Sequence, residues 1–246
     1  MSIKERFKAR AVLPLATVLF LTAAGPGPAA GPDMDYAAVF GAKYAAAELF
    51  VKTNAWISGA LALDSGEACL ALAVVFPEII RYSALEDLVQ VRALKVLYVQ
   101  YGEKHANFSV GHFQMKPTFA EQVERDANRL LTPEERTAAG VPVFATEDSV
   151  TRRRDRVLRL DDPKWQARYL GLFMRIMAFK HRSTKFAGPV DRLRFYATAY
   201  NAGYTNSEKT IRRIMSAKNF HTKLFESETK YCYADIAAFF FARNKD

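Results

Sequence analysis

The stretch VVFPEIIRYS, Val74–Ser83, places a single carboxylate inside an apolar run. Glu78 follows Pro77, and the apolar residues resume directly after it. A carboxyl group in apolar surroundings resists ionisation, because its charged form loses hydration. Its pKa then rises, and the group can hold a proton near neutral pH and exchange it with a substrate. Glu78 is therefore the candidate acid, and a structural ion pair with Arg81 is the alternative interpretation.

The composition around this stretch predicts a helical protein with a sizeable core. The chain has 246 residues, of which 50% are hydrophobic and 13% aromatic, so that one large domain can bury enough apolar surface to fold. Eighteen Phe and eleven Tyr stand against only 12 Gly, which favours helices over a turn-rich sandwich. We expect residues 31–246 to form a single, mainly helical domain.

Apolar residues at steps of three and four predict the individual helices. Ser65 is the expected cap of the helix that ends near Pro77, and Thr132 and Asp162 each precede a proline in the pattern of a capped helix start. No stretch alternates convincingly in the manner of a strand. The predicted helices cover residues 35–51, 55–63, 67–75, 85–101, 118–131, 164–181, 190–199, 207–217 and 233–243, and another helix starts at 132–135.

The first thirty residues are typical of a secretory signal peptide. Basic residues in Met1–Arg10 precede the apolar stretch Ala11–Ala24, which is too short to span a membrane as a helix, and small residues follow. We expect cleavage between Ala24 and Ala30 and export to the periplasm or cell envelope; an uncleaved segment would act as a membrane anchor.

Charge indicates the kind of partner. Removal of the leader lowers the net charge from +9 to +6, which suits an anionic polymer such as a cell wall, or an anionic membrane surface. Export argues against nucleic acid as a partner. The basic run Thr151–Arg159 fits either a phosphate-binding surface or a solvated helix face, and the second interpretation is the more common one.

Cysteine and histidine usage points to no metal and no cofactor. Cys69 and Cys232 form either one disulfide or two separate buried thiols, and the sequence leaves both open. The four histidines are scattered without ligand spacing. The mature part has no glycine-rich phosphate loop, and we therefore predict neither a metal site nor a cofactor.

Three segments in order carry a resemblance to a known family. Glu78 ends an apolar helix, the block Gly111-His112-Phe113-Gln114-Met115-Lys116-Pro117-Thr118 follows, and Ala199-Tyr200-Asn201-Ala202-Gly203 comes later. This series, over roughly residues 65–204, resembles the soluble lytic murein transglycosylases, which share the goose-type lysozyme fold. The Ala-Tyr-Asn block is the most specific of the three.

The resemblance implies a function and a set of site residues. The family cleaves the MurNAc–GlcNAc β-1,4 bond of peptidoglycan without water and leaves a 1,6-anhydroMurNAc end, with one Glu as acid and base. By position, Glu78 would be that residue, Tyr200 would orient it, and Asn201 would bind an N-acetyl or sugar group. Gln114 would line the sugar groove, and apolar walls would come from Phe113, Met115, Phe195 and Tyr204.

The sequence departs from the family at two places. Ile79 stands where a Ser usually follows the Glu, and Gln114 stands 36 positions after Glu78, roughly twice the usual separation. The surplus predicts an inserted helix over 85–101, as a lid or a partner surface, and it brings Glu86 and Glu103 forward as alternative acids. The alternative functions are a catalytically inactive lysozyme-fold protein that binds peptidoglycan as a scaffold, and an exported basic protein bound to nucleic acid or anionic lipid.

Overall fold

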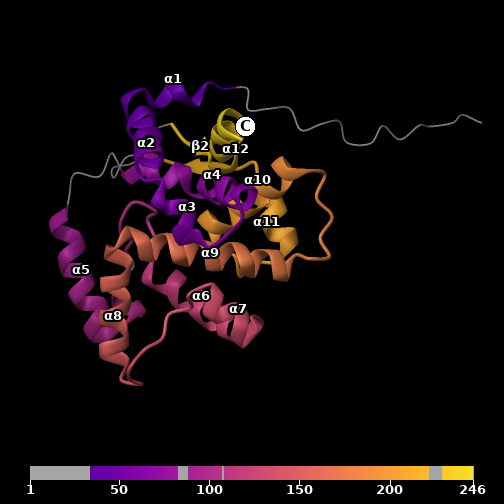
Figure 1. Cartoon of the computed structure of the whole chain (residues 1–246). Helices are drawn as coiled ribbons and strands as arrows, with labels where there is room; N and C mark the ends of the chain where they lie inside the picture. Colours follow the sequence, from indigo (N-terminus) through magenta and orange to yellow (C-terminus); the bar gives the residue numbers. More distant parts are fainter. Residues whose placement is uncertain (1–33, 83–87, 107, 222–228, 246) are drawn as a thin grey trace, which may run out of the picture.

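The computed structural model describes residues 34–82, 88–106, 108–221 and 229–245 (Figure 1). The described chain is mainly helical, as predicted. The expected signal peptide, Glu86 and the first residues of the expected insertion lie outside it. The helices are α1 (Tyr36–Phe40), α2 (Ala42–Thr53), α3 (Trp56–Leu61), α4 (Ser65–Tyr82), α5 (Leu88–Tyr101), the 3-10 helix η1 (Glu103–His105), α6 (Pro117–Leu130), α7 (Pro133–Ala138), α8 (Ser149–Asp161), α9 (Pro163–Lys180), α10 (Pro189–Ala202), α11 (Glu208–Ile214) and α12 (Tyr233–Asn244).

Helix α9 lies between two groups of helices (Figure 1). On one side it packs against α3 and α4, and α4 in turn packs against α2, α10 and α12. On the other side α9 packs against α6 and α8, and α5 lies along α8. The helix predicted over 85–101 is thus present as α5, which lies along α8 and away from α12.

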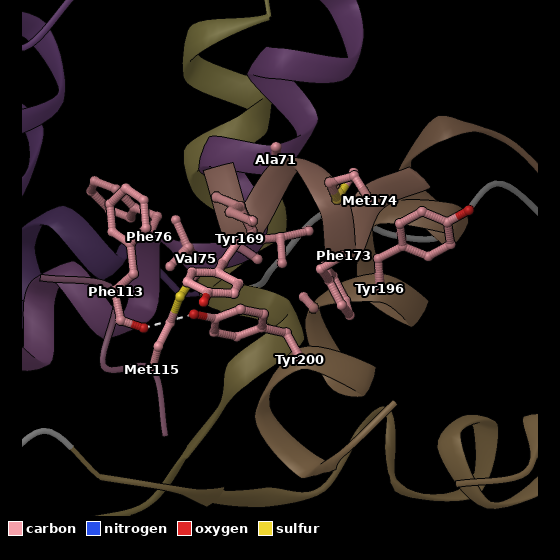
Figure 2. Packing of buried hydrophobic residues seen from close by; sticks show 14 of the residues in the cluster. Ala71, Val75, Phe76, Phe113, Met115, Tyr169, Phe173, Met174, Tyr196 and Tyr200 are labelled. Carbon is pink, nitrogen blue, oxygen red and sulfur yellow. Dashed lines mark hydrogen bonds between the residues drawn. The ribbon is translucent and has the colours of Figure 1, made fainter. Parts of the chain in front are cut away.

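Buried residues of α4, α9 and α10 pack together in the core (Figure 2). Phe76 of α4 stacks on Phe240 of α12 with 3.8 Å between ring centroids, and Tyr44 of α2 meets Phe76 edge-on at 5.0 Å. Burying each such side chain stabilises the fold by about 1.5–3 kcal/mol. These contacts hold α4, and hence Glu78, against α12 and α2.

Helices α3 and α9 approach so closely that only glycine fits between them. A Cβ atom on Gly171 would lie 2.1 Å from the backbone oxygen of Leu61. The Gly171 position therefore sets the separation of the two helices and places α9 beneath α4.

Helix ends test the sequence predictions residue by residue. The Thr132 cap is confirmed as a capping box with Glu135, and the Asp162 side chain accepts a hydrogen bond from the Lys164 amide at 2.9 Å. The expected Ser65 cap is wrong. Ser65 is already helical, and Asp64 accepts from the Glu67 amide at 2.9 Å in its place.

Pro77 was expected to end its helix, and this prediction is wrong. Helix α4 continues through Pro77 to Tyr82. A proline inside a helix lacks the N–H that would bond to the carbonyl four residues earlier, which is costly. The segment around Pro77 is fully buried against the neighbouring helices, and this packing outweighs the local cost. The continued helix carries Glu78 and Arg81 on one helical stretch.

Two short strands were not predicted. Strand β1 (Lys218–Phe220) pairs antiparallel with β2 (Tyr231–Cys232). Segments of two and three residues are too short to show the alternation on which strand prediction depends. The pair leads directly into α12 and fixes where that helix starts.

The basic run on α8 contains a buried ion-pair network. Arg156 donates to Glu124 at 2.6 Å and to Glu121 and the Tyr98 hydroxyl at 3.0 Å each. The Tyr169 hydroxyl donates to the same Glu124 at 2.6 Å. At Arg156 the interpretation as a solvated helix face is therefore wrong, because this side chain joins α8 to α5 and α6, and Tyr169 of α9 joins the network through Glu124.

The two cysteines are free thiols, so the disulfide alternative is not realised. Cys69 Sγ lies 3.4 Å from the Asn244 carbonyl oxygen, and Cys232 Sγ lies 3.2 Å from that of Met215. Among the helices of the described residues, none is both long and apolar enough to cross a bilayer. The same residues contain no group of three or more His, Cys, Asp or Glu side chains placed to hold a metal ion.

Candidate active site

Glu78 lies near the end of α4 with its carboxyl group almost fully enclosed. The side chain is buried, with 6% of the residue exposed, and Oε2 has no hydrogen-bond partner among the described residues. Burial raises the pKa of Glu78 to about 7, while the charges of Arg81 and Lys116 act in the opposite direction. The ion pair of the alternative interpretation is loose, because Arg81 Nη1 lies 3.9 Å from Oε2, beyond hydrogen-bond distance. A carboxyl group in this state can give and take a proton near neutral pH.

A cavity of about 510 Å³ opens beside this carboxyl group. Its walls come from the end of α4, the turn before α6, one side of α6 and the end of α10. The cavity has the size of a small-molecule or sugar site. It brings together five of the predicted site residues, which are Glu78, Gln114, Met115, Tyr200 and Asn201.

The remaining predicted residues divide between the cavity wall and the core. Tyr204 lines the cavity, as predicted, whereas Phe113 and Phe195 are fully buried and are not among the lining residues. The structure therefore places the Phe113 and Phe195 side chains in the core and not in the cavity wall. Glu103 also lines the cavity, but it is exposed, and burial of the kind that acts on Glu78 is absent there.

A tight turn before α6 presents Gln114 to the cavity. Val110 and Met115 exchange two backbone hydrogen bonds of 2.9 and 3.1 Å, which close the turn. Gln114 takes a positive φ of 48°, an uncommon conformation for a residue with a side chain. Its amide Nε2 donates to the Gly111 carbonyl at 2.8 Å, so that the side chain is held in place by its own turn.

Gln166 of α9 fixes this turn from below, and the sequence analysis missed it. Its Oε1 accepts from the Phe113 amide at 2.8 Å, and its Nε2 donates to the Leu160 carbonyl at 2.5 Å. Gly111 has φ 67°, and a Cβ atom there would lie 1.6 Å from Gln166 Nε2. Only glycine can stand at 111 while Gln166 stays in position. The one available signal was a lone amide on the otherwise apolar face of the α9 helix.

Tyr200 connects α10 to the same turn. Its hydroxyl donates to the Phe113 backbone oxygen at 2.7 Å (Figure 2). A phenol has one hydrogen to donate, so Tyr200 does not donate to the Glu78 carboxylate, as a direct orienting role would require. Burial and the nearby charge of Glu78 raise the pKa of Tyr200 well above its ordinary value, which keeps the phenol neutral.

Tyr233, the first residue of α12, is a second residue that sequence reasoning missed. Within the described part of the chain its buried hydroxyl has no hydrogen-bond partner, and its pKa is raised well above the ordinary value by burial and then by the charges of Glu78 and Tyr200. Helix α12 therefore contributes to the electrostatic surroundings of Glu78. No motif around Tyr233 indicated this role.

The cavity also carries positive charge. Arg81, Lys116 and Arg125 line it together with Glu78 and Glu103. With Glu78 protonated the lining is net cationic, which suits a substrate that bears carboxylates.

Comparison with models of known protein families, with curated proteins and with solved structures found no match to this chain.

Proposed function

We propose that this chain is an exported lytic transglycosylase that cleaves the MurNAc–GlcNAc bond of peptidoglycan in a goose-type lysozyme-like domain. The observation that carries the proposal is the shared cavity: residues 78, 114, 200 and 201 come from three separated segments and meet beside one buried carboxyl group. These are the segments on which the family resemblance rests. If each segment served only the core or a helix cap, nothing would require all three to line the same cavity.

The protonation state of Glu78 supports the first step. At neutral pH a substantial share of the carboxyl groups carries a proton, because the pKa is about 7. Protonated Glu78 donates this proton to the glycosidic oxygen as the bond from the MurNAc C1 atom to that oxygen breaks. The GlcNAc portion leaves as an alcohol, and Glu78 becomes a carboxylate.

The second step returns the proton. The 6-hydroxyl oxygen of the same MurNAc attacks C1 and forms the 1,6-anhydro ring, and its proton passes to Glu78. No water is consumed, and the acid ends in its starting state. One carboxyl group therefore suffices, whereas a hydrolase usually has two flanking the bond.

The polar and charged residues of the cavity fit a peptidoglycan strand. Gln114 and Asn201 offer amides for hydroxyl and N-acetyl groups, and Met115 and Tyr204 offer apolar surface. Arg81, Lys116 and Arg125 match the lactyl and peptide carboxylates of the polymer.

The departure at Ile79 does not change the cavity. Ile79 is buried in the core and is not among the lining residues, so that an apolar residue there removes no group from the substrate side. The alternative of an inactive binding protein rests on that departure and on the insertion. The raised pKa of Glu78 favours the enzyme, since a binding surface gains nothing from a buried carboxyl group that loses hydration.

Purified mature protein incubated with peptidoglycan tests the proposal. We expect soluble muropeptides with anhydroMurNAc ends, and a Glu78→Gln variant should be slower by about 10²–10⁴-fold, the usual contribution of a positioned acid. Glu103→Gln is the matched control from the same cavity and should keep most of the activity. Reducing ends in place of anhydro ends would identify a hydrolase; saturable binding without any product would identify the scaffold protein.

A further inference from the structure

A second cavity lies on the other side of α6. It is an open cavity of about 780 Å³, lined by α6, the segment before α8 and the first turns of α8. Its size falls within the range of ligand sites. None of the three segments of the family resemblance contributes a lining residue to this second cavity, because the α6 residues that line it begin at Glu121.

The second cavity carries planar polar groups beside an aromatic ring. Guanidinium groups of Arg125, Arg129 and Arg152 and the amide of Asn128 line it together with Phe144. Arg152 lies over the Phe144 ring with 4.9 Å to the centroid. The side chains of Arg125 and Arg129 are 62% and 68% exposed, and their N–H groups are accessible to a ligand.

The charges of the second cavity are nearly balanced. Arg156 forms ion pairs with Glu121 and Glu124. Arg152 pairs with Glu147, and Arg129 pairs with Asp126, each at 2.7 Å. Carboxylates beside every arginine repel a polyphosphate, and the cavity therefore does not fit nucleic acid. Paired guanidinium, carboxylate and amide groups next to an aromatic face suit hydroxyl and N-acetyl groups of sugars.

Arg125 joins the two cavities. It lines the Glu78 cavity and the second cavity at once. Its Nη2 atom donates to Gln122 on the Glu78 side at 2.8 Å, and Nη1 lies 3.7 Å from Glu121 on the other side. A polymer that leaves the Glu78 cavity over α6 therefore meets Arg125 first and the second cavity next.

We propose that the second cavity binds further sugars of the same peptidoglycan strand whose scissile bond lies at Glu78, with Arg125 between the two sites. The inference rests on the proposed substrate class. It makes the protein selective for long strands, because a short oligosaccharide fills the Glu78 cavity alone.

Binding measurements separate this proposal from the proposed activity. The background is the mature chain with Glu78→Gln, which prevents turnover, and the probes are peptide-free GlcNAc–MurNAc strands, one a tetrasaccharide and one a long fraction. The test variant adds Arg152→Ala and Asn128→Ala, both exposed or half-buried side chains outside the Glu78 cavity. The matched control adds Arg154→Ala, an exposed arginine of α8 that lines neither cavity.

We expect the double variant to weaken long-strand binding about tenfold, equivalent to about 1.4 kcal/mol, and to leave tetrasaccharide binding and the control unchanged. Unchanged long-strand affinity, or an equal loss for both lengths, would overturn the second site. Length-dependent binding without anhydro products from the wild-type chain would keep the second site and reject the proposed activity. Binding of a single-stranded oligonucleotide at the second cavity, with no glycan binding, would overturn the inference in favour of nucleic acid.

Discussion

The Tyr200 hydroxyl and the Phe113 backbone oxygen are 2.7 Å apart, which ties the end of α10 to the turn that presents Gln114. The two residues are 87 positions apart in the chain, and the bond is buried. It couples two of the three segments of the candidate site through a backbone atom. Replacement of the phenol hydroxyl alone therefore tests the turn and not the packing.

Tyr200→Phe should lower stability by about 1–3 kcal/mol, because the Phe113 carbonyl loses its buried donor. The looser turn should also lower kcat on peptidoglycan. Urea unfolding and initial rates of muropeptide release measure the two effects. Tyr196→Phe, a buried tyrosine on the same helix outside the Glu78 cavity, is the control and should keep its activity. Equal rates for Tyr200→Phe and the wild type would remove the turn from the mechanism.

Glu78 should make the protein less stable as pH rises. Its folded pKa of about 7 lies above the ordinary value of 4.5, so that between these values the folded state holds a proton that the unfolded state has lost. The contribution of Glu78 to the free energy of unfolding is therefore most favourable below about pH 4.5. It is lost as the pH rises through 7, by on the order of 3 kcal/mol in total. Glu78→Gln should flatten this part of the curve. Denaturant midpoints across the pH range measure it, and an unchanged slope in the variant would show that the carboxyl group ionises normally.

The charge of Lys116 should set the alkaline limit of activity. Lys116 acts to lower the pKa of Glu78, so that Lys116→Met should raise that pKa and shift the alkaline limb of kcat/KM to higher pH. Because Glu78 acts protonated, the wild-type rate should decline above about pH 7, about tenfold per pH unit. Lys209→Met removes an exposed lysine outside the cavity and should leave the limb in place. A shift to lower pH in Lys116→Met would contradict the role of Glu78 as the acid.

Gly111→Ala should be strongly destabilising. The position has φ 67°, and the new methyl group would collide with Gln166. We expect a loss of at least about 2 kcal/mol together with loss of activity. Gly59→Ala is the matched control, since nothing lies within 4 Å of its Cβ position and the residue is helical; stability there should stay level or rise by up to about 1 kcal/mol. Thermal unfolding of both variants measures these changes in stability. An unchanged unfolding temperature for Gly111→Ala would show that the turn can relax.

The ion pairs of Arg156 and Arg152 should differ in strength according to burial. Glu124→Gln leaves the buried Arg156 without its main partner and should cost about 3–5 kcal/mol. Glu147→Gln breaks a pair whose acidic partner is 94% exposed, and the cost should stay below about 1 kcal/mol. Denaturant unfolding of the two variants in one buffer makes the comparison. A loss of stability in Glu124→Gln as small as that in Glu147→Gln would mean that the α6–α8 network contributes little.

The sequence predicted the residues of the site whose motifs are local. Each of these residues stands in a short sequence block that a proline or glycine marks, and all of them line one cavity: Glu78, Gln114, Tyr200 and Asn201. Gln166 and Tyr233 could not be found in this way, because what makes them important is a partner far along the chain. Pro77 shows the limit of local rules for the fold: its helix-ending signal is valid in isolation and is overridden by burial of α4.

The stacking of Phe240 on Phe76 and the charge interaction between Glu78 and Tyr233 make the acidity of this carboxyl group depend on the docking of α12. With α12 undocked, water would reach Glu78, which would then ionise like a surface glutamate. Docking of α12 excludes this water, so that only the completely folded chain holds a proton on Glu78 near neutral pH.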